Sequence, residues 1–539
     1  MERRRTVKKI EFNLLEEPWI RVRTPDCALQ EVSLTDALLH AHEYAGLAGE
    51  LPTQDVAVLR LLLAVLQTIF YRVDLEGSPS PLTDEEDALD RWGQLWEEKR
   101  LPEKPILDYL TAWRERFWLF HPERPFYQVL EAQIGTEYGA KKLNGEVSES
   151  ENKYRLFQSY GGTEKDSLTY GQAARWLLYL NGFDDTSAKP KGKGLPSVGA
   201  GWLGKIGLFL ARGNTLAETL LLNMVLLKDG QELWAPPCPY WELDQPRSGE
   251  RTEIPLPDNQ AALLTLQSRR IFLHREEGRV TGYRLLGGDF FERENSFCEQ
   301  MTIWDNPSKK KNVPLAYPPL CHDPAKQLWR EFPSAFTVDP RAHIPGIVQW
   351  LIALRNYIGK DAVLQFESVC AVYGDKNSFV TDAFADSLTF HRAVLDTANA
   401  EARRKITQEV LFCEEIAEAV GDLAKEVAKS AGGQGVPETA RARFYFAIDQ
   451  PFRRWLASLD PEEDMDEAVL SWRSQAKGIA RQVGKALVEE AGPSALVGRC
   501  EKIKKGNKEI KLYHAAPKAF NHFLWELKKI YEEKGGNKV

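Results

Sequence analysis

Two hydrophobic periods divide the first 390 residues into expected helices and strands. Apolar side chains recur every three or four positions over 56–71 and 216–227, which predicts two helices. Over 264–285, two runs of alternating apolar and polar residues flank Glu276-Glu277-Gly278, which predicts a β-hairpin. Loops rich in Pro and Gly separate these runs, so we expect a large domain of mixed α+β class.

Beyond residue 391 the alternating pattern fades and a helical period replaces it. Apolar residues between Leu395 and Val427 recur every three or four positions, and Gly432-Gly433 follows as a stop signal. Further helices are expected from Pro437, from the cap signal Asp460-Pro461-Glu462 to about Ala491, and over 517–533. Four amphipathic helices in succession predict a four-helix bundle. The expected domains are therefore 1–390, of mixed α/β structure, and 391–539, the bundle.

The length and the cysteine pattern narrow the class of protein. At 539 residues the chain exceeds the size at which one hydrophobic core stops growing. The most apolar stretch, 56–73, carries Arg60, Gln67 and Arg72, so we expect a buried helix and no membrane span. The basic first residues are not followed by the apolar core of a signal peptide. Seven singly placed cysteines without a CxxC pair suit a reducing compartment, so we expect a cytoplasmic protein without a structural zinc site.

A search for catalytic residues finds no recognised arrangement. The nine histidines show no HExxH spacing, and neither a GxxxxGK[ST] phosphate loop nor a convincing dinucleotide fingerprint is present. Acidic pairs are frequent, but 78 Asp and Glu residues produce such pairs by chance. We therefore expect no catalytic residue, no metal and no cofactor. A nucleic-acid-processing enzyme stays open as an alternative.

Positive charge is concentrated in one segment, although the formal net charge of the chain is −8. The 32 residues of 186–217 contain no acid and hold four lysines, including Lys205, one arginine and seven glycines. Glycine permits close backbone approach, and exposed N–H groups beside lysines suit a phosphate or a narrow groove. The tightest part of this segment comprises Gly199, Ala200 and Gly201. The same residues also fit a turn between packed elements with Trp202 and Ile206 buried, and the pattern leaves both interpretations open.

Two further segments have the composition of nucleic-acid contacts. Residues 153–160 interleave basic and aromatic side chains, which stack on bases or pack inward as an edge strand. Residues 373–379 carry a turn signal between two strand-like runs, so a polar tip is expected to project there. An ordinary solvent-exposed turn is the alternative for the second segment.

Several stretches resemble one known family, in the same order along the chain. They are FNLLEEPWI (12–20), FHPERPFYQ (120–128), ARGNTLAETLLLN (211–223), LQSRRIFLHREEGRVTG (266–282) and ETARARFYF (438–446). Together they resemble the CasA-type large subunit of the type I-E CRISPR Cascade complex. The resemblance implies a large amino-terminal domain of unusual mixed fold joined to a carboxy-terminal four-helix bundle.

The resemblance also implies a function in antiviral defence. Such a subunit binds guide RNA together with backbone and small subunits, and it recognises the protospacer-adjacent motif of double-stranded target DNA through the minor groove. It then starts strand separation and helps to recruit a separate helicase-nuclease. Minor-groove recognition suits several related motifs, because that groove presents a degenerate pattern of donors and acceptors. A structural scaffold that contacts only guide RNA and protein stays open as an alternative.

Site residues follow from the resemblance position by position. The family's glycine loop falls on Gly199, Ala200 and Gly201. Its first DNA-sensing loop falls on a stretch that includes Asn152, Tyr154, Arg155 and Phe157. Its strand-separating wedge falls on Lys376, Asn377 and Ser378, where some relatives carry glutamine in place of Asn377. Arg284 is the basic residue nearest to a minor-groove lysine of relatives, and basic residues of the bundle such as Lys477 and Arg481 are a hypothetical path for the displaced strand.

Overall fold

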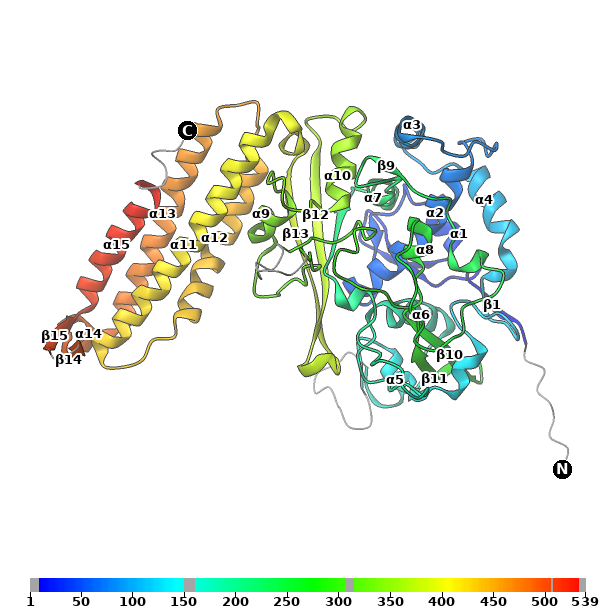
Figure 1. The fold of residues 1–539 in the computed structure, drawn as a ribbon, viewed down its shortest axis with the longest axis horizontal. Helices are drawn as coiled ribbons and strands as arrows, with labels where there is room; N and C mark the ends of the chain where they lie inside the picture. Colours follow the sequence, from blue (N-terminus) through cyan, green and yellow to red (C-terminus); the bar gives the residue numbers. More distant parts are fainter. Residues whose placement is uncertain (1–8, 150–159, 306–314, 506–507, 533–539) are drawn as a thin grey trace. The chain divides into compact units, whose positions relative to one another are not determined.

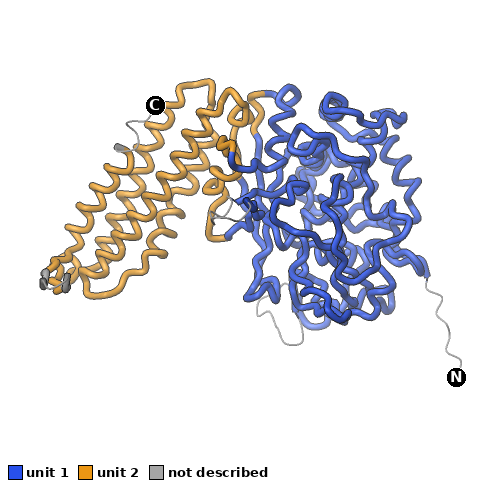
Figure 2. Tube along the Cα trace, in the orientation of Figure 1, with its two compact units in different colours: residues 1–323, 341–359, 364–387 blue, residues 324–340, 360–363, 388–539 orange. Residues whose placement is uncertain are grey.

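The computed structural model describes residues 9–149, 160–305, 315–505 and 508–532. The chain divides into two compact units, shown in Figure 2. Unit 1 comprises Met1–Asp323, Arg341–Gly359 and Leu364–Ser387, and unit 2 comprises Pro324–Pro340, Lys360–Val363 and Leu388–Val539. The last segment of unit 2 begins two residues before the boundary expected at 390, but its two short earlier segments were not expected from the sequence.

Unit 1 is built around the apolar helix α2 (Pro52–Arg72), which packs against α6 (Tyr170–Phe183) and α8 (Gln260–Leu264). Helix α2 is long and apolar enough to cross a membrane, but 94% of its most apolar window is buried inside the structure. The sequence prediction of a buried helix is therefore confirmed. Its Arg60 is also buried, because an acidic partner described below neutralises it.

The helix expected over 216–227 is shorter than predicted. Helix α7 (Leu216–Asn223) ends where the amide of Asn223 bonds the backbone of Ala211 in both directions, at 3.0 Å as acceptor and 2.6 Å as donor. These bonds fix the helix end to strand β7 (Leu208–Arg212), and the chain then continues into strand β8 (Leu227–Lys228).

Two three-stranded sheets support the candidate site in unit 1. In the first, the order is β10 (Arg269–Glu276), β11 (Arg279–Gly287) and β6 (Thr136–Gly139), and all pairs are antiparallel. The predicted hairpin is confirmed, because Glu277 and Gly278 have φ of 48° and 78°, as a tight primed turn between β10 and β11 requires.

The second sheet has the order β13 (Val380–His391), β12 (Val363–Tyr373) and β7. Its two long strands β12 and β13 lie side by side in Figure 1. The turn that joins them contains the expected polar tip. The remaining helices and strands of unit 1 are β1 (Glu11–Asn13), β2 (Ile20–Arg23), β3 (Leu29–Val32), α1 (Leu34–Leu39), β4 (Gly46–Leu47), α3 (Glu85–Glu97), α4 (Glu103–Ala112), β5 (Trp118–Phe120), α5 (Ala140–Leu143), β9 (Glu232–Leu233) and α10 (Gly346–Ala353).

Unit 2 contains the predicted bundle. Its long helices in the described residues are α11 (Ala400–Ala431), α12 (Pro437–Ser458), α13 (Met465–Glu490) and α15 (Ala516–Glu532), seen in Figure 1. Gly432 ends α11 with φ of 89°, as the stop signal predicted. The α+β fold class with a carboxy-terminal helical bundle is thus confirmed.

Helix α13 begins later than predicted. The Asp464 side chain caps it by accepting from the backbone N–H groups of Asp466 and Glu467. The expected cap, Asp460, instead accepts from the N–H of Glu462 in the preceding turn. Helix α14 (Gly492–Val497) and the hairpin of β14 (Arg499–Lys505) and β15 (Lys508–His514) were not expected from the sequence.

A tryptophan explains why Pro324–Pro340 belongs to unit 2. The ring of Trp329 stacks on Phe452 of α12 with centroids 4.3 Å apart, and its Nε1–H donates to Asp449 at 2.9 Å. Short helix α9 (Phe332–Ala335) lies in the same segment. The sequence pattern assigned this segment to the first domain, because its apolar residues show no period that indicates their partner.

Candidate nucleic-acid interface

The three residues of the predicted glycine loop differ in accessibility. Gly199 is half-buried, whereas Ala200 and Gly201 are buried. A Cβ atom on Gly201 would lie 2.3 Å from the carbonyl oxygen of Gly182 at the end of α6. Internal packing therefore requires glycine at 201. At Gly199 a Cβ would meet only the Lys205 side chain, at 3.6 Å, but φ is 67°, a value that disfavours other residues.

Buried side chains follow the loop directly. Trp202 and Ile206 are 5% and 1% exposed, as expected for a turn between packed elements. Of the residues Gly199, Ala200 and Gly201, only Gly199 is partly exposed. A role of this loop in DNA recognition stays a prediction.

A buried arginine fixes the shape of the glycine loop. Arg269, at the start of β10, donates through Nη2 to the carbonyl of Gly199 at 2.7 Å and to that of Asp185 at 3.0 Å. Its Nε donates to the Asp184 carboxylate at 2.5 Å, and both side chains are 1% exposed. The N–H of Gly201 donates to the Asp184 carbonyl at 2.9 Å. The loop is therefore held by internal bonds and does not depend on a ligand for its shape.

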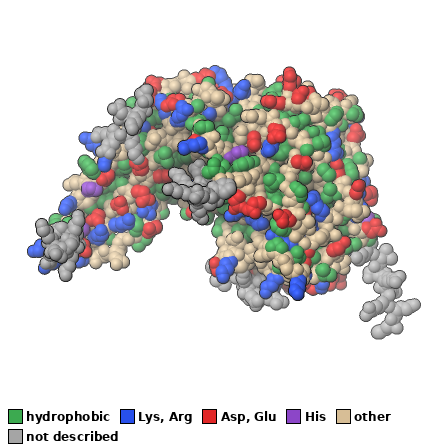
Figure 3. Space-filling model, viewed as in Figure 1, with side chains coloured by type: hydrophobic (Ala, Val, Ile, Leu, Met, Phe, Trp, Pro, Cys, Tyr) green, Lys and Arg blue, Asp and Glu red, His purple; other side chains and the backbone are tan. Residues whose placement is uncertain are grey.

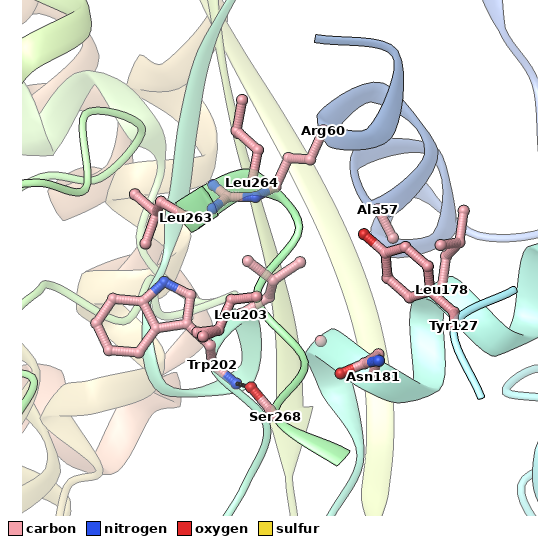
Figure 4. A pocket seen from close by; sticks show the side chains of 12 residues that line it. Ala57, Arg60, Tyr127, Leu178, Asn181, Trp202, Leu203, Leu263, Leu264 and Ser268 are labelled. Atoms are coloured by element: carbon pink, nitrogen blue, oxygen red, sulfur yellow. Dashed lines mark hydrogen bonds between the residues drawn. The ribbon is translucent and has the colours of Figure 1, made fainter. Parts of the chain in front are cut away.

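A second network holds the residue after the glycines. The Trp202 N–H donates to the Ser268 hydroxyl at 3.1 Å, and its indole Nε1–H donates to Glu299 at 2.9 Å. Arg60 of α2 binds the same carboxylate with both terminal nitrogens, at 2.9 and 3.0 Å. Figure 4 shows Arg60, Trp202 and Ser268 around a cavity of about 30 Å³. That volume holds about one water molecule and no substrate.

Two cations beside Gly199 form no ion pair with an acidic residue within the described part of the chain. Burial, followed by the neighbouring charge of Arg251, lowers the pKa of Lys205 to about 8. Burial and the charge of Arg269 lower the pKa of Arg251 to about 10. Both residues line one small cavity with Ala200, and the Arg251 guanidinium lies 3.8 Å from the ring centroid of Phe290. Positive charge is therefore concentrated here, and Glu292 opposes it at Lys205 without forming an ion pair.

One other cation of the acid-free segment is neutralised by a residue that lies far away in the sequence, and an acidic side chain binds part of the segment's backbone. Arg212 pairs with Glu367 of β12, so it lies in the sheet and contributes no free charge to the loop. The Glu250 carboxylate accepts from the N–H groups of Lys191 and Gly192 at 2.8 and 3.0 Å. Sequence reasoning also missed Arg251, because it follows an acid outside the basic segment.

The predicted wedge is a tight turn at the end of β12. Lys376 and Asn377 are exposed, and both adopt left-handed backbone conformations with φ of 55° and 54°. The turn is closed by the N–H of Asn377 on the Gly374 carbonyl at 3.0 Å and that of Ser378 on the Asp375 carbonyl at 3.2 Å. Neither Lys376 nor Asn377 has a side-chain hydrogen bond or ion pair to any described residue. The tip is polar and projecting, as predicted.

Of the remaining predicted residues in unit 1, only Arg284 is among those that the structure describes. Arg284 pairs with Glu137 of β6 at 2.6 Å and donates to the Gln133 carbonyl at 2.5 Å, so its charge is already engaged. Its role as a DNA contact stays a prediction. Asn152, Tyr154, Arg155 and Phe157 lie outside the described residues.

Metal-binding groups do not cluster in the described ranges, where no set of three His, Cys, Asp or Glu side chains is placed to hold an ion. The seven cysteines are all unpaired. Buried Cys413 and Cys370 have raised thiol pKa values, because burial disfavours the thiolate.

Comparison with known proteins finds relatives that match most of the chain in sequence and in fold. A family model for CRISPR-associated protein Cse1 matches residues 13–483. The CRISPR-associated protein CasA/Cse1 of Thermus thermophilus is 29% identical over 509 residues, which are 90% of this chain and 94% of that protein. The crystal structure of Thermobifida fusca Cse1 superposes with a TM-score of 0.81 at 29% identity, over 97% of this chain and 98% of that one.

A chain of a CRISPR RNA-guided surveillance complex has the same fold, with a TM-score of 0.66 at 18% identity, over 89% of this chain and 99% of that one. The resemblance identified from the sequence motifs is therefore confirmed. Because the family model spans most of its length, this chain belongs to the Cse1 family of CRISPR-associated proteins.

Proposed function

We propose that this chain is the large subunit of a cytoplasmic CRISPR surveillance complex. It binds beside the guide RNA and the backbone and small subunits, and it recognises the protospacer-adjacent motif of double-stranded DNA through the minor groove. The turn at Lys376, Asn377 and Ser378 starts strand separation, and the subunit helps to recruit a separate helicase-nuclease. Family membership and the shared fold of a surveillance-complex chain support this proposal.

The observation that carries the proposal is the pair of cations beside Gly199, Lys205 and Arg251, which form no ion pair with the described residues. On the face shown in Figure 3, acidic and basic side chains are interspersed, as a net charge of −8 leads one to expect. DNA phosphates need local positive charge on such a protein. Lys205 and Arg251 supply it where the rigid loop presents the backbone of Gly199, and contact with a DNA phosphate relieves their mutual repulsion.

Charge removal at these two positions tests the proposal. Lys205→Gln and Arg251→Gln are each expected to weaken binding of motif-bearing duplex by the assembled complex about threefold to tenfold. Each lost phosphate contact also reduces the slope of log affinity against log salt by about 1. Arg100→Gln is the matched control, because it removes one exposed cation that has no ion pair to described residues.

The scaffold alternative gives a different result. If the loop contacts only guide RNA and protein, both substitutions leave the salt slope and the discrimination between motif-bearing and motif-free duplex unchanged. That result in the assembled complex would remove the glycine loop from DNA recognition.

A further inference from the structure

We propose that Thr186 is a positioning residue that ties the wedge turn to the glycine loop, so that recognition and opening elements form one rigid body. The effect on DNA opening rests on the proposed function, whereas the bonds that hold the turn do not depend on DNA. The short segment 183–187 follows α6 and contacts both loops.

Thr186 binds the backbone of the wedge turn at its tip. Its N–H donates to the Asn377 carbonyl at 3.0 Å, and its hydroxyl Oγ1 lies 3.1 Å from the carbonyls of both Lys376 and Asn377. Two successive non-glycine residues in the left-handed region are strained, so surrounding contacts must hold them there. Outside the turn, Thr186 is the described residue that hydrogen-bonds the carbonyls of both Lys376 and Asn377.

The neighbours of Thr186 hold the glycine loop. Asp184 accepts from the N–H of Gly201 through its carbonyl and from Arg269 through its carboxylate, and Arg269 in turn binds the Gly199 carbonyl. A single residue, Asp185, therefore separates a direct anchor of the glycine loop from a direct anchor of the wedge.

Strand β12 also contacts this segment, through a tyrosine just before the turn. The Tyr373 hydroxyl donates to the Phe183 carbonyl at 2.7 Å. A Cβ atom on Gly204 would lie 1.9 Å from that hydroxyl, so Tyr373 packs directly on Gly204, three residues after the glycine loop. The wedge turn and the strand before it are thus bonded, through Thr186 and Tyr373, to the segment 183–186 that anchors the glycine loop.

This arrangement makes the direction of the wedge side chains depend on Thr186. The Lys376 and Asn377 side chains have no hydrogen bond or ion pair to the described residues, so the backbone of the turn sets the direction in which each side chain leaves the chain. Loss of the Thr186 hydroxyl permits the turn to leave the left-handed conformation, and the tip side chains then point elsewhere. Thr186 acts through the turn and touches no DNA in this proposal.

Hydrogen exchange of the purified chain tests the structural part. Thr186→Val keeps the side-chain shape and the backbone bond to Asn377 but removes the hydroxyl. Loss of one such hydrogen bond raises the equilibrium constant for local opening about fivefold. Exchange of the Asn377 and Ser378 amides should therefore accelerate about fivefold. Thr186→Ser keeps the hydroxyl and should exchange like the native chain. Unchanged exchange in Thr186→Val, in a variant with native thermal unfolding, overturns the proposal; if that variant does not fold, Thr186→Ala takes its place.

Strand opening by the assembled complex tests the consequence. Thr186→Val should slow opening of intact duplex about fivefold and leave a duplex already mismatched beside the motif unaffected. Combined with replacement of 376–378 by a glycine-rich turn, it should add no further slowing, since both changes act on one element. Equal slowing on both duplexes overturns the coupling. Accelerated exchange without any slowing supports Thr186 as the anchor of the turn and removes the wedge from the proposed function, so the two failures are distinguishable.

Discussion

Gly199 and Gly201 stand two positions apart but are glycine for different physical reasons. At Gly201 any side chain collides with the backbone of α6, whereas at Gly199 the positive φ is the constraint and space is open. Substitutions at the two positions therefore distinguish a defect in binding from a defect in folding. Sequence alone could not make this distinction, because the close contact comes from Gly182, which lies outside the loop.

Substitution by aspartate is expected to affect the two positions differently. Gly199→Asp introduces backbone strain of about 1 kcal/mol and puts a carboxylate next to Lys205, so it should abolish motif binding while the chain still folds. Gly201→Asp should destabilise the fold by about 3 kcal/mol or more, because backbone atoms must shift. Thermal unfolding and duplex binding measure both effects, and Gly199→Ala controls for strain without charge. Normal binding by Gly199→Asp would contradict a close approach of DNA to this loop.

The lowered pKa of Lys205 predicts opposite effects of pH on binding and on folding. The groups that face its ammonium are Arg251, Arg269 and Arg293, with Glu292 opposing them. Because the folded pKa of about 8 lies below the ordinary value of 10.5, the folded chain loses this proton first as pH rises. The free energy of unfolding therefore increases between pH 8 and 10.5 through this lysine. Its attraction for phosphate is lost over the same range, because the ammonium group is deprotonated.

Duplex binding should accordingly weaken about tenfold between pH 7 and 9, if only the protonated form contacts the phosphate. Lys205→Arg keeps its charge over this range and should remove most of the dependence. Affinity of the assembled complex, measured at constant ionic strength across that range, checks this. An equal pH dependence in the native and arginine forms would assign the effect to another group.

At the scale of elements, local signals predicted most of the framework. The hairpin of β10 and β11 was found because Glu277 and Gly278 form a turn between alternating runs, and α11 because Gly432 ends a long apolar stripe. Errors arose where two local signals competed. Asp460 and Asp464 both fit a helix cap, and only the bonds made in the fold decide between them.

Local signals also predicted part of the candidate site. An acid-free segment and a turn signal are visible in the sequence, so the positions of Lys205 and Lys376 were found. Thr186 and Arg251 carry no local signal, since one is a single polar residue in a loop and the other follows Glu250. Their relevance depends on long-range contacts, and no period along the chain reports such contacts.

The wedge turn predicts a dependence on the state of the DNA. Opening the first base pair costs a few kcal/mol of unstacking, and a tip that occupies the gap offsets part of that cost. Replacing Lys376, Asn377 and Ser378 by a glycine-rich turn should slow opening of intact duplex about tenfold and change a pre-mismatched duplex little. Asn377→Gln is a matched variant that lengthens the tip and should open intact duplex at least as fast as the native chain. Equal effects on both substrates would remove the wedge assignment.

At the scale of the whole molecule, the net charge and the packing around the glycine loop both bear on its proposed role. The chain is acidic overall, so its positive charge acts locally, at Lys205 and Arg251. The cavity beside the glycine loop, of about 30 Å³, is roughly a tenth of the volume of a small ligand pocket. Arg60, which lines this cavity, and Glu299 form an ion pair, and Glu299 also holds Trp202 in place, so the pair supports the loop.

The purified chain is accordingly expected to hydrolyse neither ATP nor DNA. Its sequence lacks a phosphate loop, and in the described ranges no carboxylate and histidine side chains converge as metal ligands. Phosphate release from Mg–ATP and nicking of supercoiled plasmid measure the two activities, with a mock purification as the control. Nicking that requires a divalent metal, follows the chain through size exclusion and disappears on substitution of one acidic pair, such as Glu292 and Glu294, would make this subunit a nuclease. The absence of such activity would agree with the proposed function, in which a separate helicase-nuclease cleaves the target.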